Sequence, residues 1–412
     1  MLMDLEKTEK GFSLISKRIF DLKELKLVFV SILIFTIFLF FISPPWRVLN
    51  FDEVDYFNAS NQGFWINAFD TTSLGIKSFF SLASWKLKLI DSPPTFLEYS
   101  EKFDTFLLRH FHPPLLQYIT SYFTFIYKGD FNTAEKLVFL VRWGLGCVFI
   151  LSSFFISSFL YNSKKKKFYY LVKILFISYS ALLLSLYLQY HLLFSIFLII
   201  NLYFLINLLK TPSRSNYLFI SIILTLSILS LETALFSILI SSTIYSFIRI
   251  KRVDLIISEF KRVIIYFWIL PFTFSVILWP GALFKLSIFK SYGMYVYRLF
   301  FIKNEYAGVF NFERLSPILL LLLVYFFLFS LGLIILNNFI SFKFQKISPY
   351  KLSFIFGSFY SISMLPFALF HTYIVPGLFI ATLPILEFLN RDILNKRLIK
   401  IINYILVICI AI

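Results

Sequence analysis

Side chains that could do chemistry gather just after the first apolar run of the chain. Asp52 and Glu53 are adjacent acids in Phe51–Phe57, FDEVDYF, and Asp55 lies two residues beyond them. A carboxylate within about 3 Å of a hydroxyl can remove its proton as a general base. The same acids also suit the first turn of a surface helix, where negative charge meets the helix dipole. The pair alone leaves catalysis and capping both open.

Two further motifs contain a basic side chain that could bind an anion. Arg142 lies inside the apolar run Leu140–Gly146, LVRWGLG. A charge there is costly in lipid and needs a partner or a function, unless its side chain reaches the headgroups. His112 opens His112–Leu115, HPPL, whose prolines are typical of a helix start because proline needs no internal hydrogen bond there. A guanidinium or a protonated imidazole can stabilise a departing phosphate.

The remaining candidates are isolated residues near predicted turns. His191, Glu232 and His371 fall on the same side of the membrane as His112 in the topology predicted below. Each lone histidine can equally be a hydrogen-bonded interface residue. Histidines and acids of this kind could hold a divalent metal, but no fixed spacing supports a site. The sequence therefore assigns no cofactor and leaves a divalent metal open.

The composition requires membrane helices to position these residues. Of the 412 residues, 59% are hydrophobic and only 15% are charged, whereas soluble chains are about 45–50% apolar and about 25% charged. Such an excess would expose large apolar patches to water, which excludes a soluble enzyme, a secreted module and a disordered chain. Long unbroken apolar runs favour helices over the short alternating segments of a barrel. The predicted fold class is an all-α polytopic membrane protein.

About eleven apolar runs approach the length needed to cross about 30 Å of hydrocarbon. The stretch 218–248 is too long for one crossing, so we split it at Glu232-Thr233, its only strongly polar break. The first run has a long polar lead and no cleavage signal, which predicts an uncleaved anchor. The predicted crossings are 27–43, 137–161, 168–188, 191–209, 216–231, 234–248, 263–280, 315–338, 352–370, 372–389 and 398–412.

Basic residues decide the orientation of these crossings. The segment His112–Tyr127 could be a short crossing or an interfacial helix, and a crossing would put the lysines of Lys164–Lys167 outside. The positive-inside bias therefore favours an interfacial helix, for which its aromatic residues and its polar edge at Gln117, Ser121 and Thr124 are suited. Most of the 39 basic residues then lie inside. The net charge of +17 is mostly explained by the positive-inside bias of the loops, so it does not indicate a nucleic-acid partner.

The predicted organisation has no separate soluble domain, and the candidate residues all lie on the extracytoplasmic side. Its parts are a cytoplasmic segment (1–26), the first transmembrane helix (27–43), an extracytoplasmic loop with juxtamembrane helices (44–136), transmembrane helices two to seven (137–280), a second outer loop (281–314) and transmembrane helices eight to eleven (315–412).

In this order, the motifs resemble those of the GT-C membrane glycosyltransferases, nearest to the protein O-mannosyltransferases and the lipid A aminoarabinose transferases. The similar segments are an acidic first outer loop (Phe51–Phe57), a Pro-Pro juxtamembrane motif (His112–Leu115), an arginine-bearing start of the second crossing (Leu140–Gly146), two outer turns (Tyr187–Phe194 and Leu229–Phe236) and a late segment (His371–Pro384). The spacing is similar over about residues 27–250 and loose afterwards. His191 and Glu232 depart from the acid and the lysine that family members often carry there, and His112 from the lysine of the aminoarabinose branch.

The resemblance implies a GT-C-like bundle of about eleven transmembrane helices with a helical first outer loop, in the cytoplasmic membrane of a bacterium. It implies transfer of a sugar from a polyprenyl-phosphate carrier to a glycan, lipid or protein acceptor on the outer face, with inversion. Asp52 would be the general base, and Glu53 would orient the loop or bind substrate. The other implied roles are donor-phosphate binding by Arg142, His112 and His371 and substrate binding by Asp55, His191 and Glu232.

Two other functions remain open from the residues. A transporter or flippase for a lipid-linked sugar or an amphipathic solute would suit many helices with buried polar groups. Transporters often show paired repeats and broken helices near the middle of the membrane, and the sequence shows neither clearly. A non-catalytic membrane scaffold would suit the departures at His191 and Glu232.

Overall fold

The computed structural model describes a bundle built from helices alone. Its described residues are 22–49, 53–54, 57, 88, 114–126, 131–160, 167–186, 188–231, 233–249, 256–279, 349–364 and 371–388. They form ten continuous helices, and no strand occurs among them. The helices are α2 (Leu22–Ile42), α6 (Leu115–Ile126), α7 (Phe131–Leu160), α8 (Lys167–Ser185), α9 (Tyr190–Lys210), α10 (Arg214–Ser230), α11 (Ala234–Arg249), the continuous α12 (Ile256–Val263), η3 (Ile264–Ile269) and α13 (Leu270–Leu278), α17 (Pro349–Ser363) and α18 (His371–Phe388).

Four of these helices are long and apolar enough to cross a membrane. They contain the spans Glu24–Ile42, Ala134–Phe159, Tyr190–Lys210 and Ile257–Leu278. Shorter apolar helices lie between them in the bundle, in α8, α10, α11 and α18. Together they make the chain a multi-pass membrane protein, the coarse form of the predicted fold class.

The helix boundaries follow the hydropathy pattern closely. The split at Glu232-Thr233 is confirmed, since α10 ends at Ser230 and α11 begins at Ala234. The largest differences are the starts of α7 and α12, which precede the predicted starts by several residues. Polar and charged residues near both starts explain the differences, namely Glu135 and Lys136 in α7 and Glu259 and Lys261 in α12. A hydropathy pattern rejects such residues, although a helix can carry them at the membrane surface. The predicted helices 315–338 and 398–412 lie outside the described residues.

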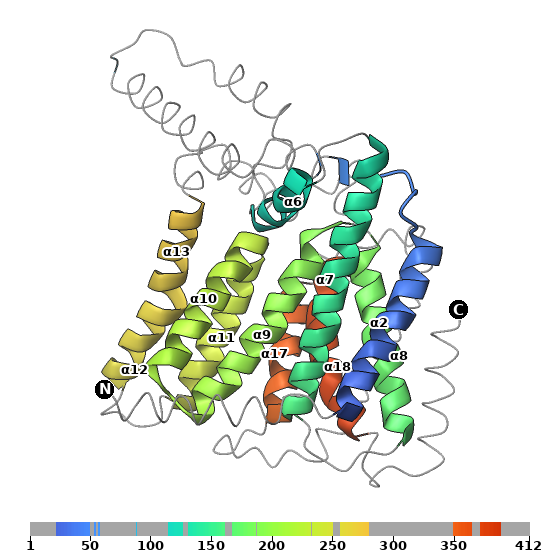
Figure 1. The fold of residues 1–412 in the computed structure, drawn as a ribbon. Helices are drawn as coiled ribbons and strands as arrows, with labels where there is room; N and C mark the ends of the chain where they lie inside the picture. Colours follow the sequence, from blue (N-terminus) through green and yellow to red (C-terminus); the bar gives the residue numbers. More distant parts are fainter. Residues whose placement is uncertain are drawn as a thin grey trace, which may run out of the picture.

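The helices run alternately up and down through the bundle (Figure 1). We call the upper end in Figure 1 the outer end, after the predicted orientation; α2, α8, α10 and α13 end there, and α7, α9 and α11 begin there. The lower, inner end carries Lys210, Arg214, Arg249 and Lys261. This grouping is the one that the predicted alternation of crossings requires.

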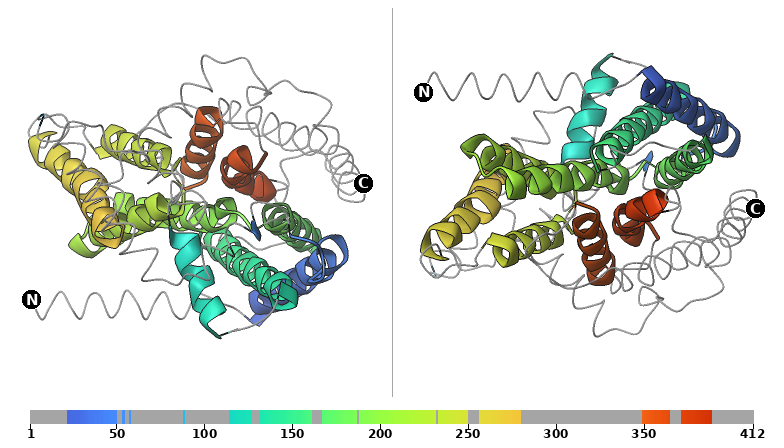
Figure 2. Two further views of the ribbon diagram at one scale, coloured as in Figure 1. Left: turned by 90° about the horizontal axis from the view of Figure 1, so that it is seen from above. Right: turned by 90° about the horizontal axis from the view of Figure 1, so that it is seen from below.

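Helix α9 occupies the middle of the bundle (Figure 2). It contacts α7, α10 and α11 and also the pair formed by α17 and α18. Helices α17 and α18 approach each other most closely at two glycines. A Cβ atom at Gly357 would collide with the carbonyl oxygen of Gly377 and the backbone nitrogen of Ala381. Small residues permit such contacts between membrane helices. Aromatic rings fill the space nearby, where Phe176 stacks on Phe379 with centroids 5.4 Å apart.

Helix α6 lies across the outer end of the bundle, as the interfacial prediction for 112–127 requires (Figures 1 and 2). The hydroxyl of Tyr118 donates to the carbonyl oxygen of Leu278, 3.2 Å away at the end of α13. Burial raises the pKa of Tyr118, so this donor stays protonated. The polar edge of α6 faces the protein, because Gln117 and Ser121 are buried whereas Tyr122 is exposed. An inward polar face is expected where the bundle offers polar groups beneath the helix.

Candidate functional site

The site begins where α2 stops at the outer end. Pro44 and Pro45 follow Ser43, the first residue after the helix. They prevent its continuation, because proline has no N–H to donate and its ring clashes with the preceding turn. The backbone nitrogen of Arg47 donates to the carbonyl oxygen of Pro44 at 3.1 Å, so the chain turns back. This turn leaves Ser43 buried and brings Arg47 to the rim of the bundle.

Arg142 ties this turn to the end of α8. Its Nη1 donates to Ser43 Oγ at 2.7 Å and to the carbonyl oxygen of Leu186 at 2.6 Å. Its Nη2 donates to the carbonyl oxygen of Ser43 at 3.3 Å, and only 2% of the residue is exposed. Carbonyl groups at helix ends have no partner in their own helix, so a guanidinium suits them. A phosphate could reach Arg142 only if these contacts parted.

Glu53 is the buried carboxylate of the site. Its Oε2 accepts a hydrogen bond from Arg47 Nη2 at 2.6 Å. Its Oε1 accepts one from the backbone nitrogen of Leu188 at 2.9 Å and lies 3.9 Å from Arg142 Nε. A buried charge requires this kind of pairing with opposite charge and hydrogen-bond donors. Below, the outer cluster means Ser43, Arg47, Glu53 and Arg142 with the backbone of Leu186 and Leu188.

The outer cluster joins three of the sequence motifs described above. Glu53 belongs to Phe51–Phe57, Arg142 to Leu140–Gly146, and Leu188 to Tyr187–Phe194. The hydrogen bond between Glu53 and Leu188 links positions 135 residues apart. An acid, a cation and a turn that were identified separately in the sequence therefore meet at one end of the bundle.

The other predicted site residues fall into two groups. His191 is a buried residue at the start of α9, with its ring 5.6 Å from that of Tyr190, and His371 begins α18. The remainder are Asp52, Asp55, His112 and Glu232, which lie outside the described residues, as does the side chain of His371. Within the described ranges, no group of three or more His, Cys, Asp or Glu side chains could hold a metal. The divalent metal stays a prediction.

Two members of the outer cluster are missing from the sequence-based candidates. Ser43 bridges Arg142 and α8, because its Oγ also donates to the carbonyl oxygen of Leu186 at 3.2 Å. Arg47 binds Glu53 directly. Pro44-Pro45 was the available signal, since a forced turn at the membrane surface keeps its neighbours close to the next loop. The contributions of Leu186 and Leu188 could not be predicted from residue type, because they are made by backbone atoms.

A second polar cluster lies toward the inner end and was not predicted. Glu259 in α12 is buried; its Oε1 accepts from Arg262 Nη1 at 2.6 Å and its Oε2 from the hydroxyl of Tyr245 at 2.5 Å. The hydroxyls of Tyr245 and Tyr217 are 2.5 Å apart. We call Tyr217, Tyr245, Glu259 and Arg262 the inner cluster. It links α10, α11 and α12.

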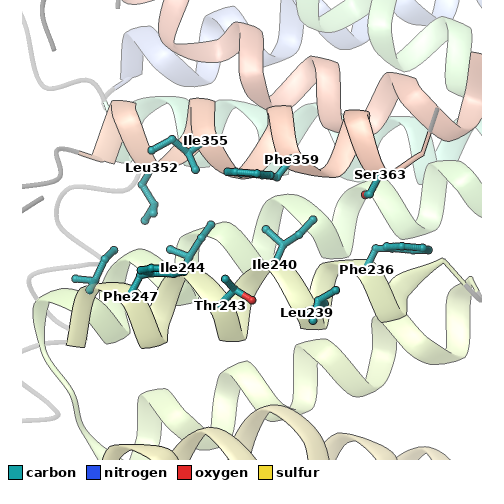
Figure 3. A pocket seen from close by; sticks show the side chains of 11 residues that line it. Phe236, Leu239, Ile240, Thr243, Ile244, Phe247, Leu352, Ile355, Phe359 and Ser363 are labelled. Atoms are coloured by element: carbon teal, nitrogen blue, oxygen red, sulfur yellow. The ribbon is translucent and has the colours of Figure 1, made fainter. Parts of the chain in front are cut away.

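An apolar groove of about 470 Å³ lies between α11 and α17 (Figure 3). Its side chains come from both helices and point toward one another across the gap. Leu239, Phe247 and Phe359 are exposed along it, so the groove opens toward the surroundings of the bundle. Its outer end at Phe236 and Ser363 lies beside the residues where Thr233 Oγ1 approaches the Tyr360 hydroxyl at 3.3 Å.

The arrangement combines two features that bear on chemistry. A carboxylate lies between two guanidinium groups at one end of a membrane bundle, and an apolar groove runs along helices of the same bundle. Fixed cations of this kind can stabilise an anion, and a nearby carboxylate can accept a proton. No protein-family model, no curated protein and no solved structure matches this chain.

Proposed function

We propose that this protein is a glycosyltransferase that takes a sugar from a polyprenyl-phosphate carrier. The acceptor is a glycan, a lipid or a protein on the outer side of the membrane. The observation that carries the proposal is the outer cluster, where Glu53 lies 3.9 Å from Arg142 and bonds the turn before α9. The GT-C resemblance gives both residues a role in one site, with Glu53 in the first outer loop and Arg142 at the start of the second crossing.

Asp52 is the general base in this proposal. Asp52 directly precedes Glu53 in the sequence, within the acidic segment Phe51–Phe57. It removes the proton of the acceptor hydroxyl, whose oxygen bonds to the anomeric carbon. The bond from that carbon to the carrier phosphate oxygen breaks, and the phosphate leaves with the electron pair. The positive charge at the outer cluster stabilises the leaving phosphate.

The groove between α11 and α17 supports the same proposal. A polyprenyl tail is apolar and long, so it needs a lipid-facing channel that ends near the reacting phosphate. The groove is lined almost wholly by apolar side chains from the two helices. Its outer end lies beside Thr233, which follows the predicted substrate residue Glu232 in the sequence. The groove thus has the apolar lining that such a tail needs.

Sugar transfer in membranes that contain the protein tests the proposal. Membranes receive a panel of polyprenyl-phosphate sugars with labelled sugar, and label on the acceptor is measured. We expect transfer by the wild type and a loss of at least about 100-fold with Asp52→Asn, since general-base catalysis contributes about 10²–10⁴-fold. Asp392→Asn, in a segment predicted to be cytoplasmic, is the matched control and should keep full transfer. Full transfer by Asp52→Asn refutes the role of Asp52, and movement of the label across the membrane without transfer supports the flippase alternative.

A further inference from the structure

The two arginines beside Glu53 differ in access to a ligand. Arg142 is 2% exposed, and both of its Nη atoms donate to groups at the ends of α2 and α8. The side chain of Arg47 is 22% exposed. Its Nη2 lies 2.6 Å from Glu53 Oε2, and its Nη1 donates to the exposed carbonyl oxygen of Val48 at 3.3 Å. A ligand arriving from the membrane surface therefore meets Arg47 with the contacts of Arg142 intact.

The surroundings of Arg47 are those of a membrane interface. Trp46 and Val48 on either side of it are 65% and 80% exposed. The Trp46 ring packs edge-on against Phe40 near the end of α2, with centroids 5.1 Å apart. An exposed tryptophan at the end of a crossing helix is typical of the headgroup level. Arg47 thus lies at the depth of lipid phosphates.

A guanidinium can serve Glu53 and a phosphate together. It carries five N–H donors in a planar fork, so it can keep one carboxylate contact while donating to another anion. Hydrogen bonds from arginine to phosphate are charge-assisted and frequently bidentate. The bond to Glu53 Oε2 also fixes the orientation of the Arg47 side chain, which lowers the entropy lost on binding.

We infer that Arg47 binds the phosphate of the lipid-linked donor and that Arg142 is a positioning residue that holds the outer cluster together. This inference rests on the proposed function, and it names the donor contact of that same site. The phosphate of an ordinary anionic phospholipid has the same chemistry and lies at the same depth. The test therefore includes both lipids.

The experiment uses the full chain in nanodiscs of zwitterionic lipid, with polyprenyl monophosphate as the probe. We expect Arg47→Gln to weaken binding at least about tenfold, the factor that corresponds to 1.4 kcal/mol and lies at the low end for bonds to charged groups. Arg47→Lys keeps the charge without the fork and should bind with intermediate affinity. Arg214→Gln, an exposed basic residue at the inner end, is the matched control and should bind like the wild type.

A second variant distinguishes a role of Arg47 in stability from a role in binding the lipid phosphate. Arg47→Gln leaves Glu53 without one partner, so the double variant Arg47→Gln/Glu53→Gln removes both charges and keeps the shape of the pair. We expect the double variant to recover the thermal midpoint of unfolding but not the affinity for polyprenyl phosphate. Recovery of both would overturn the inference.

The other outcomes are also decisive. Wild-type affinity in every Arg47 variant overturns the inference and leaves the proposed function standing. Absence of polyprenyl phosphate binding by the wild type overturns the proposed function itself. In nanodiscs that contain phosphatidylglycerol, an equal loss of binding for that lipid and for polyprenyl phosphate in Arg47→Gln would make Arg47 a general headgroup contact, which overturns the assignment to the donor.

Discussion

Two buried glutamates toward opposite ends of the bundle are paired with arginine in different ways. At the outer end, Glu53 bonds Arg47 and the backbone of Leu188, a residue 135 positions away in the chain. In the inner cluster, Glu259 bonds Arg262, three residues on in the same helix, and the hydroxyl of Tyr245. The outer cluster is thus assembled from helix ends and loops, whereas the inner one is assembled from side chains within helices.

This difference suggests different roles: we expect the outer cluster to be a ligand site and the inner cluster to be a contact that holds helices together. Helix ends present unpaired carbonyl and N–H groups, and the outer cluster satisfies several of them with one buried guanidinium. At such a site, N–H groups can donate to the oxygens of a ligand, and carbonyl groups can accept from its hydroxyls. The inner cluster fixes α12 against α10 and α11 through tyrosine hydroxyls, and the helices carry its groups without a turn or loop. We therefore expect the outer cluster to be the more costly to disturb.

Loss of Arg142 should have the largest effect. Arg142→Met removes the N–H groups that donate to Ser43 Oγ and to the carbonyl oxygen of Leu186. It also leaves the buried Glu53 with less positive charge nearby. Removal of one partner from a buried pair costs about 3–5 kcal/mol, so the folded protein should be strongly depleted. The thermal midpoint in detergent measures the effect. Arg214→Met, at an exposed position, is the control, and an unchanged midpoint for Arg142→Met would refute a clamping role.

Loss of the Tyr245 hydroxyl should have an intermediate effect. Tyr245→Phe removes the donor to Glu259 Oε2 and the contact with the Tyr217 hydroxyl. An unsatisfied buried acceptor costs about 1–3 kcal/mol. Tyr203→Phe, at another buried tyrosine of the bundle, is the matched control and should change the midpoint less. A larger loss for Tyr245→Phe than for Arg142→Met would reverse the ranking of the two clusters.

Loss of Arg262 should have the smallest effect. Its side chain is 47% exposed, and its pair with Glu259 spans one helical turn. Because the guanidinium is solvated, we expect a contribution near that of exposed pairs, about 0–1 kcal/mol and screened by salt. The buried Glu259 also keeps its hydrogen bond from Tyr245 when Arg262 is replaced. We expect Arg262→Gln to lower the midpoint slightly at low ionic strength and by less in 1 M salt, a concentration at which the Debye length is about 3 Å. A loss as large as that of Arg142→Met would remove the distinction between the clusters.

The helices could be read from the sequence because a hydropathy pattern reports burial in lipid directly. The break at Glu232-Thr233 followed from polarity alone. The interfacial position of 112–127 was predicted from charge and stays a prediction. The first turns of α7 and α12 were missed, because charged residues at the membrane surface look like loop in the same pattern.

The contacts of the site were less accessible from the sequence. The acid and the arginine were identified by type and motif, and Glu53 and Arg142 do lie together. Ser43 and the backbone atoms of Leu186 and Leu188 could not be identified, because any residue type supplies a carbonyl or an N–H. The inner cluster was missed for another reason. Its tyrosines fall in apolar runs where an aromatic side chain is normally lipid-facing or core, and only the packing of three helices joins their hydroxyls.

The glycine contact between α17 and α18 determines which side of the groove can yield. At Gly357 and Gly377 there is no room even for a methyl group, so the backbones of α17 and α18 are in direct contact. The two helices are therefore expected to move together. In the proposed function the groove receives a branched isoprenoid chain, which is wider than a linear acyl chain, so the distance between α11 and α17 would have to increase. Because α18 holds α17, this widening would have to come from α11, which the hydrogen bond between Tyr245 and Glu259 joins to α12.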